Sequence, residues 1–222
     1  EDLSTQVSKH PKAVAVQVPD YSISVAGHVR MGPDDSSPIQ PGLIRSINDI
    51  NEKDSALIAT GDMTWQGKAL YWDDVDRLVR DKLSIPLHVA VGNHDMFKNA
   101  HSAFIERYGP TYFSTQIGRS NLLILDTELE SNDITGNQLE LALKTIKETT
   151  NDPSIDHLFV FMHRVLWFSD KERYKSVIER ANKSSRFPSI DDARTTMTFW
   201  TELFPALSEL AKSKRVVVFA GD

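Results

Sequence analysis

The chain has 222 residues, of which 40% are hydrophobic, and it carries a formal net charge of −6. This size suffices for one domain with a sizeable core, and the acidic balance without a basic run argues against non-specific binding to nucleic acid or to an anionic membrane surface. The absence of cysteine excludes disulfides, zinc–thiolate sites and thiol nucleophiles, and no apolar run reaches the roughly 20 residues that span a bilayer.

The two ends of the chain set expectations about domain boundaries and location. Residues 1–20 show little pattern, which predicts an N-terminal arm ahead of one domain over residues 21–222. The chain has a polar start and no initiator Met, which favours export to the periplasm or the cell exterior after removal of a signal. We also expect a longer parent chain, because a domain that stops at Asp222 would leave sheet edges exposed.

Apolar periodicity predicts alternating strands and helices in the first half of the chain. Apolar residues alternate or run continuously in three segments that read as strands, at 21–26, 56–60 and 87–91. Helical spacing predicts one helix that begins near Pro41, a residue suited to a first helical turn, and another over 68–82. This strand–helix order is typical of a largely parallel sheet covered by helices.

The second half of the chain begins with a different pattern of predicted elements. Segments 112–117 and 121–125 are separated by a glycine-led turn and predict two paired strands in a hairpin. Thr135 and Gln138 have the spacing of a capping box, which predicts the start of a helix.

Two more strands and two more helices are predicted toward the end of the chain. The strands cover 158–162 and 215–220, and a helix carries Leu203, Phe204, Leu207 and Leu210. Between them, the polar segment 164–196 has a predicted helix around residues 174–181. Such a long excursion directly after a candidate ligand is expected to supply substrate contacts.

Polar residues follow three of the predicted strands at the point where each strand ends. The motif Gly-Asp-Met-Thr at 61–64 follows one strand, Gly-Asn-His-Asp at 92–95 follows the next, and His163 follows the strand over 158–162. Carboxylate, amide and imidazole groups are metal ligands and acid–base groups. The pattern therefore predicts a functional site at one edge of the sheet. Trp65, directly after the first motif, either packs over its loop or lines a substrate pocket.

The order of these motifs resembles that of the calcineurin-like metallophosphoesterases, in particular the purple-acid-phosphatase-like branch. The stretches NLLILDTE, GNQLELAL and HLFVFMHRVLW are similar to the corresponding stretches of that family, so the resemblance covers about residues 21–222. It implies an α/β fold, a four-layer α/β/β/α sandwich with mixed sheets flanked by helices. It further implies hydrolysis of a small phosphomonoester or phosphodiester by a metal-activated hydroxide.

The resemblance implies a set of metal ligands. Asp62 would bridge two cations, since a carboxylate has two anionic oxygens. Asn93 and His163 would bind the second metal, and His28 would bind the first. Oxygen and nitrogen ligands without sulfur are compatible with one or two ions of manganese, iron or zinc.

The resemblance also implies catalytic and substrate-binding residues. His94 would face the phosphate, stabilise developing charge and protonate the leaving oxygen, and Asp95 would orient the imidazole of His94. Arg164 stands where the family commonly has a second histidine, and its guanidinium would pair with a phosphate or another anion.

Two departures from the family pattern weaken the first metal site. Ala26 stands where the family has an aspartate, two residues before His28. At the other end, Gly221 and Asp222 replace the start of a Gly-His-x-His motif, although a carboxylate at Asp222 could still bind the second metal. We therefore expect one firmly bound metal and a second that is weak or absent.

Three functions stay open on the sequence. The intact motifs at 61–64 and 92–95 favour a metal-dependent phosphoesterase. Ala26 favours either a pseudoenzyme that binds an anion or a partner on the same fold, or a one-metal enzyme acting on a non-phosphate substrate such as a carbohydrate. The sequence leaves the oligomeric state open.

Overall fold

The computed structural model describes residues 21–30, 39–97, 101–129, 132–170, 173–174, 176 and 197–221. The strands among these residues form two sheets. The first is parallel, in the order β1 (Ile23–Ala26), β2 (Ala56–Ala59), β3 (Leu87–Val89). The second follows the order β4 (Phe113–Ile117), β5 (Ser120–Ile124), β6 (His157–Met162), β7 (Arg215–Ala220). Strands β4 and β5 are antiparallel, whereas the other neighbours in this sheet are parallel.

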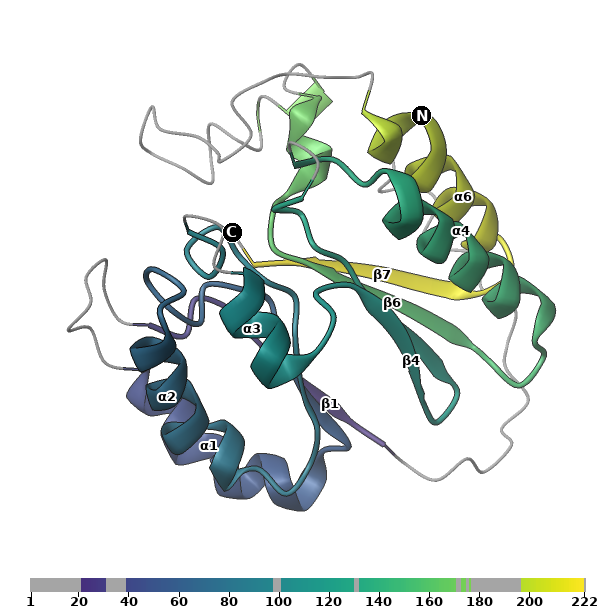
Figure 1. The fold of residues 1–222 in the computed structure, drawn as a ribbon. Helices are drawn as coiled ribbons and strands as arrows, with labels where there is room; N and C mark the ends of the chain where they lie inside the picture. Colours follow the sequence, from purple (N-terminus) through teal and green to yellow (C-terminus); the bar gives the residue numbers. More distant parts are fainter. Residues whose placement is uncertain are drawn as a thin grey trace.

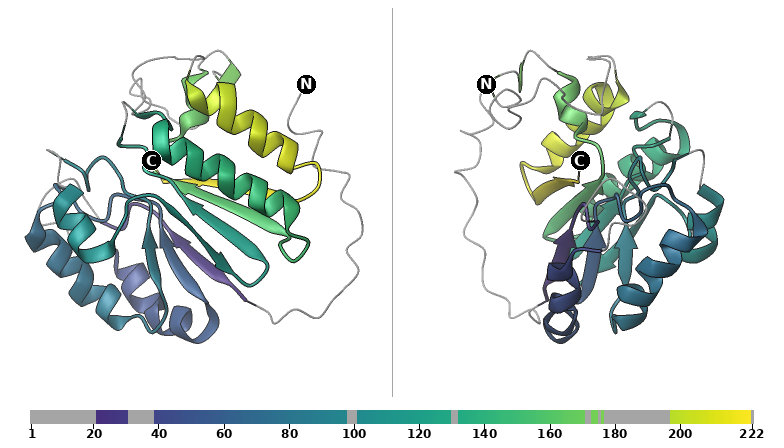
Figure 2. Two further views of the ribbon diagram at one scale, coloured as in Figure 1. Left: turned by 45° about the vertical axis from the view of Figure 1, so that its right-hand side comes forward. Right: turned by 90° about the vertical axis from the view of Figure 1, so that its left-hand side faces the viewer.

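Helices cover the outer face of each sheet (Figures 1 and 2). The first sheet carries α1 (Pro41–Lys53), α2 (Ala69–Leu78) and α3 (His101–Tyr108), whereas the second carries α4 (Gly136–Asn151) and α6 (Phe204–Leu210). Shorter helical turns are η2 (Arg80–Lys82), η4 (Leu166–Ser169) and the π-type turn η5 (Phe199–Leu203), which leads into α6. None of the described helices is long and apolar enough to cross a membrane.

Strand alternation explains why the sheets have apolar residues on both faces. In β2, Ala56 and Ile58 pack between the sheets, while Leu57 and Ala59 pack under the helices of the first sheet. Strand β6 repeats this division, since Phe161 enters the core between the sheets while Leu158, Val160 and Met162 pack against α4, η5 and α6. Three apolar layers therefore separate four layers of structure, which confirms the predicted α/β/β/α sandwich.

Most of the predicted elements are present in the structure. The parallel strands of the first sheet are confirmed, as is the hairpin, in which Gly118 and Arg119 form the turn and Ile117 faces Ser120. The helix predicted over 68–82 is shorter, because α2 ends at Leu78 and η2 follows. Helix α3 had no counterpart in the prediction. The helix predicted around residues 174–181 lies mostly outside the described residues.

The predicted capping box at the start of α4 was wrong. Thr135 is the N-cap residue, but its side chain makes no capping hydrogen bond. The Gln138 side chain reaches instead to the end of β5, where its Oε1 accepts a hydrogen bond from the backbone N of Asp126 at 2.6 Å and its Nε2 donates to the Asp126 carbonyl at 3.1 Å. Gln138 thus joins the helix to the sheet.

The two sheets bring the ends of several strands to one place. The backbone N of Thr60, just after β2, donates to the carbonyl of Ala26 at the end of β1. The backbone N of Gly221, after β7, donates to the carbonyl of His163 after β6 at 2.9 Å. The loops that carry the sequence motifs therefore meet above the core between the sheets.

Candidate metal centre

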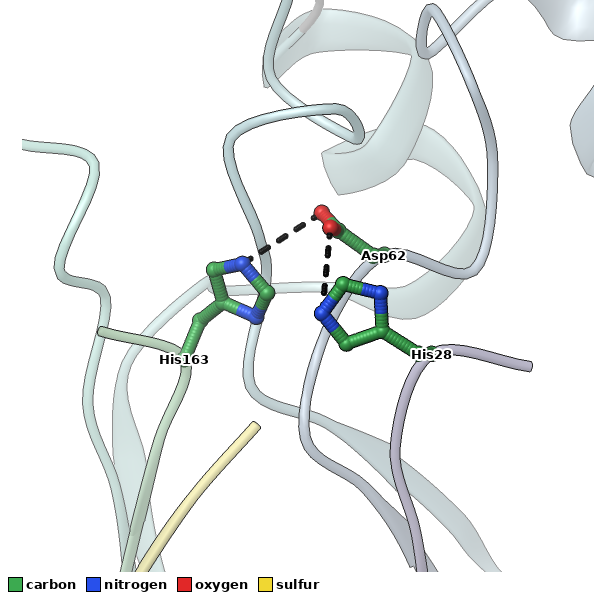
Figure 3. Close-up of side chains that lie close together, drawn as sticks. All are labelled: His28, Asp62 and His163. Atoms are coloured by element: carbon green, nitrogen blue, oxygen red, sulfur yellow. Dashed lines mark ion pairs between the residues drawn. The ribbon is translucent and has the colours of Figure 1, made fainter. Parts of the chain in front are cut away.

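Three side chains from three strand ends converge at this edge. His28 follows β1, Asp62 follows β2 and His163 follows β6, and their ligand atoms all lie within 4.8 Å of one another. The Asp62 carboxylate presents one oxygen to each imidazole: Oδ2 lies 3.7 Å from Nε2 of His28, and Oδ1 lies 3.4 Å from Nε2 of His163 (Figure 3). Asp62 and His163 are buried, whereas the His28 side chain is 54% exposed.

A backbone carbonyl sets the tautomer of His163. Its Nδ1 lies 2.9 Å from the carbonyl oxygen of Thr60. A carbonyl only accepts hydrogen bonds, so Nδ1 carries the proton and, in the neutral ring, Nε2 keeps a lone pair. This is the arrangement by which a second contact orients a metal-binding histidine.

The donor atoms around His163 fit a metal ion. Its Nε2 faces Asp62 Oδ1 at 3.4 Å and Asn93 Oδ1 at 3.0 Å. A nitrogen lone pair and two acceptor oxygens cannot hydrogen-bond to one another, because none of them supplies a proton. A divalent cation among them would interact favourably with all three. Asn93 therefore lies beside the cluster with its amide oxygen toward His163, and its role as a metal ligand stays a prediction.

Two glycines leave the space that this cluster occupies. A Cβ on Gly61 would lie 2.3 Å from Nδ1 of His163, and a Cβ on Gly92 would lie 2.4 Å from Oδ1 of Asp62. Gly61 also has a φ of 98°, a conformation that favours glycine. Asp62 (φ 55°) and His28 (φ 45°) adopt the left-handed region as well, which is uncommon for residues with a side chain and is often found at functional sites.

The family of the chain follows from a comparison with known proteins. The model of the calcineurin-like phosphoesterase family matches residues 40–194, more than half of the 222-residue chain. The chain belongs to the calcineurin-like phosphoesterase family. The matched region contains Asp62, Asn93, His94 and His163 but not His28.

A solved structure also resembles this phosphoesterase-family chain. It is the purple acid phosphatase PPD1 isolated from seeds of yellow lupin (Lupinus luteus), with 17% sequence identity and a TM-score of 0.46. The match covers 66% of this chain and 31% of that one, so this chain spans less than a third of the length of the lupin protein. No curated protein matches the chain.

In this phosphoesterase-family site, His94 contacts the cluster through its backbone, and its ring contacts Trp65. Its backbone N donates to Oδ1 of Asp62 at 3.2 Å, and the half-buried ring stacks on Trp65. Its ring is therefore not part of the cluster of His28, Asp62 and His163.

The Asp95 carboxylate has partners other than the predicted one. Oδ1 accepts hydrogen bonds from the backbone N of Thr64 at 2.8 Å and from its Oγ1 at 3.1 Å, and Oδ2 accepts from the backbone N of Gly92 at 3.0 Å. Asp95 therefore joins the two motif loops, and among the described residues no hydrogen bond connects its carboxylate to the His94 ring. Its complete burial, with a smaller effect of the Asp62 charge, raises the pKa of Asp95 to about 6.

The guanidinium of Arg164 is engaged by a carboxylate of the same chain. Its Nε and one terminal nitrogen donate to the two oxygens of Glu128, each at 2.7 Å, and both side chains are almost fully buried. The backbone N of Arg164 also donates to Oγ1 of Thr127 at 3.1 Å. This pair connects the loop after β5 to the residue that follows His163, and it holds the arginine that the sequence predicted to contact an anion.

The remaining predicted positions fall at the margins of the site. Ala26 ends β1, and its methyl side chain offers no ligand two residues before His28. Asp222 lies outside the described residues, so its predicted role as a ligand remains a prediction. Sequence reasoning assigned no role to Thr60 or to Glu128, the last residue of the stretch NLLILDTE, because each acts on a residue far away in the chain.

Proposed function

We propose that this chain hydrolyses phosphate esters with the help of one or two bound metal ions. The observation that carries the proposal is the Asp62 carboxylate, whose two oxygens each face a different imidazole. Family membership supports phosphoester chemistry in general. The substrate in this proposal is a small phosphomonoester or phosphodiester, and the nitrogen and oxygen donors suit manganese, iron or zinc.

The proposed division of labour follows from the contacts of each residue. Asp62, Asn93 and His163 would hold one metal, and His28 with Asp62 would hold a second more weakly, since Ala26 contributes no ligand. When bound, the cation supplies a Lewis acid that stabilises negative charge on a phosphoryl oxygen.

The chain itself supplies the remaining groups. The Thr60 carbonyl keeps the proton of His163 on Nδ1. The ring of His94, outside the cluster but joined to it through its backbone, would donate a proton or a hydrogen bond to the leaving oxygen. Glu128 accepts two of the hydrogen bonds of Arg164, and the contact of this guanidinium with an anion stays a prediction.

Two model esters test the proposal. Wild-type protein, supplied with manganese, iron or zinc, is expected to hydrolyse p-nitrophenyl phosphate, bis(p-nitrophenyl) phosphate or both. A chelator should abolish the activity, and the metal should restore it. Asp62→Asn is the matched control, because it preserves shape but removes the charge. Hydrolysis no faster than that of Asp62→Asn, with every metal and both esters, would overturn the proposal in favour of a binding protein on a phosphoesterase fold.

A further inference from the structure

The ring of His94 lies against the indole of Trp65. The two ring centroids are 4.0 Å apart and the planes are inclined by 22°, a stacked arrangement. In the described part of the chain, no hydrogen bond joins either ring nitrogen of His94 to another residue. The stack on Trp65 is therefore a contact that can orient this imidazole, the role that the resemblance had implied for Asp95.

Trp65 lies on a loop that is held in place by hydrogen bonds. The preceding residue, Thr64, is 1% exposed and donates from its backbone N and its Oγ1 to Oδ1 of Asp95. Two residues after Trp65, the backbone N of Gly67 donates to Oγ1 of Thr64 at 2.9 Å, and Gly67 takes a φ of 61°. Hydrogen bonds on both sides of Trp65 thus hold the loop that presents the indole.

We propose that Trp65 is the positioning residue for His94, and that Asp95 acts on His94 through Thr64 and Trp65. Stacking covers one face of the imidazole and limits rotation of the ring, which leaves the opposite face and the ring nitrogens available to a substrate. The catalytic consequence rests on the role of His94 in the proposed function. The stack itself does not depend on that role.

Nuclear magnetic resonance tests the stack without any activity. Ring protons of His94, assigned by their loss in His94→Gln, are expected upfield of ordinary histidine positions because of the indole ring current. The upfield displacement should disappear in Trp65→Leu and largely remain in Trp65→Phe. His157, which stacks on Phe159 at 5.7 Å, serves as the internal reference and should not move in either variant. Ordinary positions for His94 in the wild type, unchanged in Trp65→Leu, would overturn the proposal.

Kinetics then test the positioning role. Trp65→Leu is expected to lower kcat on the model esters about tenfold while KM stays within about twofold, since a misplaced acid affects the transition state more than binding. Trp65→Phe should restore most of the rate, because it keeps an aromatic face. A raised KM with unchanged kcat contradicts positioning and makes Trp65 a substrate-binding residue. If the wild type hydrolyses neither ester, the proposed function fails, and the chemical shifts still decide whether Trp65 orients His94.

Discussion

Replacing His94 by alanine is expected to lower the turnover of phosphate esters by about 10²- to 10⁴-fold while the bound metal is retained. The substitution removes the ring that would protonate the leaving oxygen. It keeps the backbone N that donates to Asp62 at 3.2 Å, so the loop beside the cluster should stay in place. Steady-state kinetics and metal analysis on the same preparation give both quantities.

A histidine outside the site provides the control for this substitution. His157 begins β6, at the end of that strand opposite to His163, and lines a different cavity, of about 390 Å³, with Tyr21 and Phe159. His157→Gln should leave turnover within about twofold of the wild type, as is usual for a change away from the reacting groups. An unchanged rate in His94→Ala would remove His94 from the mechanism. Loss of metal from His94→Ala would instead make it a ligand.

Removing the carboxylate of Glu128 is expected to destabilise the protein by about 3 kcal/mol or more. In Glu128→Ala, the nearly buried guanidinium of Arg164 loses the carboxylate that accepts two of its hydrogen bonds. The penalty for leaving such a charge without this partner exceeds the usual effect of a surface substitution. Urea denaturation of the wild type and the variant measures the difference in the free energy of unfolding.

An exposed ion pair is the matched comparison for Glu128. Glu209, on α6, pairs with Lys212, just beyond the end of that helix, and both side chains are more than 70% exposed. Glu209→Ala should therefore change stability by less than about 0.5 kcal/mol. A loss below about 1 kcal/mol in Glu128→Ala would show that the buried pair contributes little. If Arg164→Lys raises KM for the model esters without a loss of stability, the arginine binds substrate after all.

The positions of the strand ends could be predicted from the sequence, because a strand and the polar motif that follows it are adjacent in the chain. Each motif follows an apolar segment that reads as a strand, and the carboxyl ends of parallel strands meet at one edge of a sheet. Asp62 and Asn93 are close together for this reason, since β2 and β3 are parallel neighbours in the first sheet. His163 follows β6 of the second sheet, so its approach to Asp62 depends on how the two sheets pack. His28 joins Asp62 and His163 as well, although Ala26 had weakened the prediction, because the position of its backbone follows from the pairing of β1 with β2.

The supporting contacts could not be predicted, because they join residues that are distant in sequence. Glu128 precedes Arg164 by 36 positions, and Asp95 accepts a hydrogen bond from Thr64, which lies 31 positions earlier. The pairing of Gln138 with the Asp126 backbone shows the same difficulty. Its spacing from Thr135 suggested a local cap, and only the packing of α4 on the second sheet reveals the distant partner. Spacing in the sequence carries no information about such contacts.

The most direct test of a metal site at Asp62 is the metal content of protein purified without chelator, measured by elemental analysis beside Asp62→Ala. We predict about one equivalent of manganese, iron or zinc per chain in the wild type, or two if His28 holds a second ion, and a loss of this metal in Asp62→Ala. A wild type without metal after incubation with all three ions, or an Asp62→Ala variant that keeps the full complement, would contradict the account.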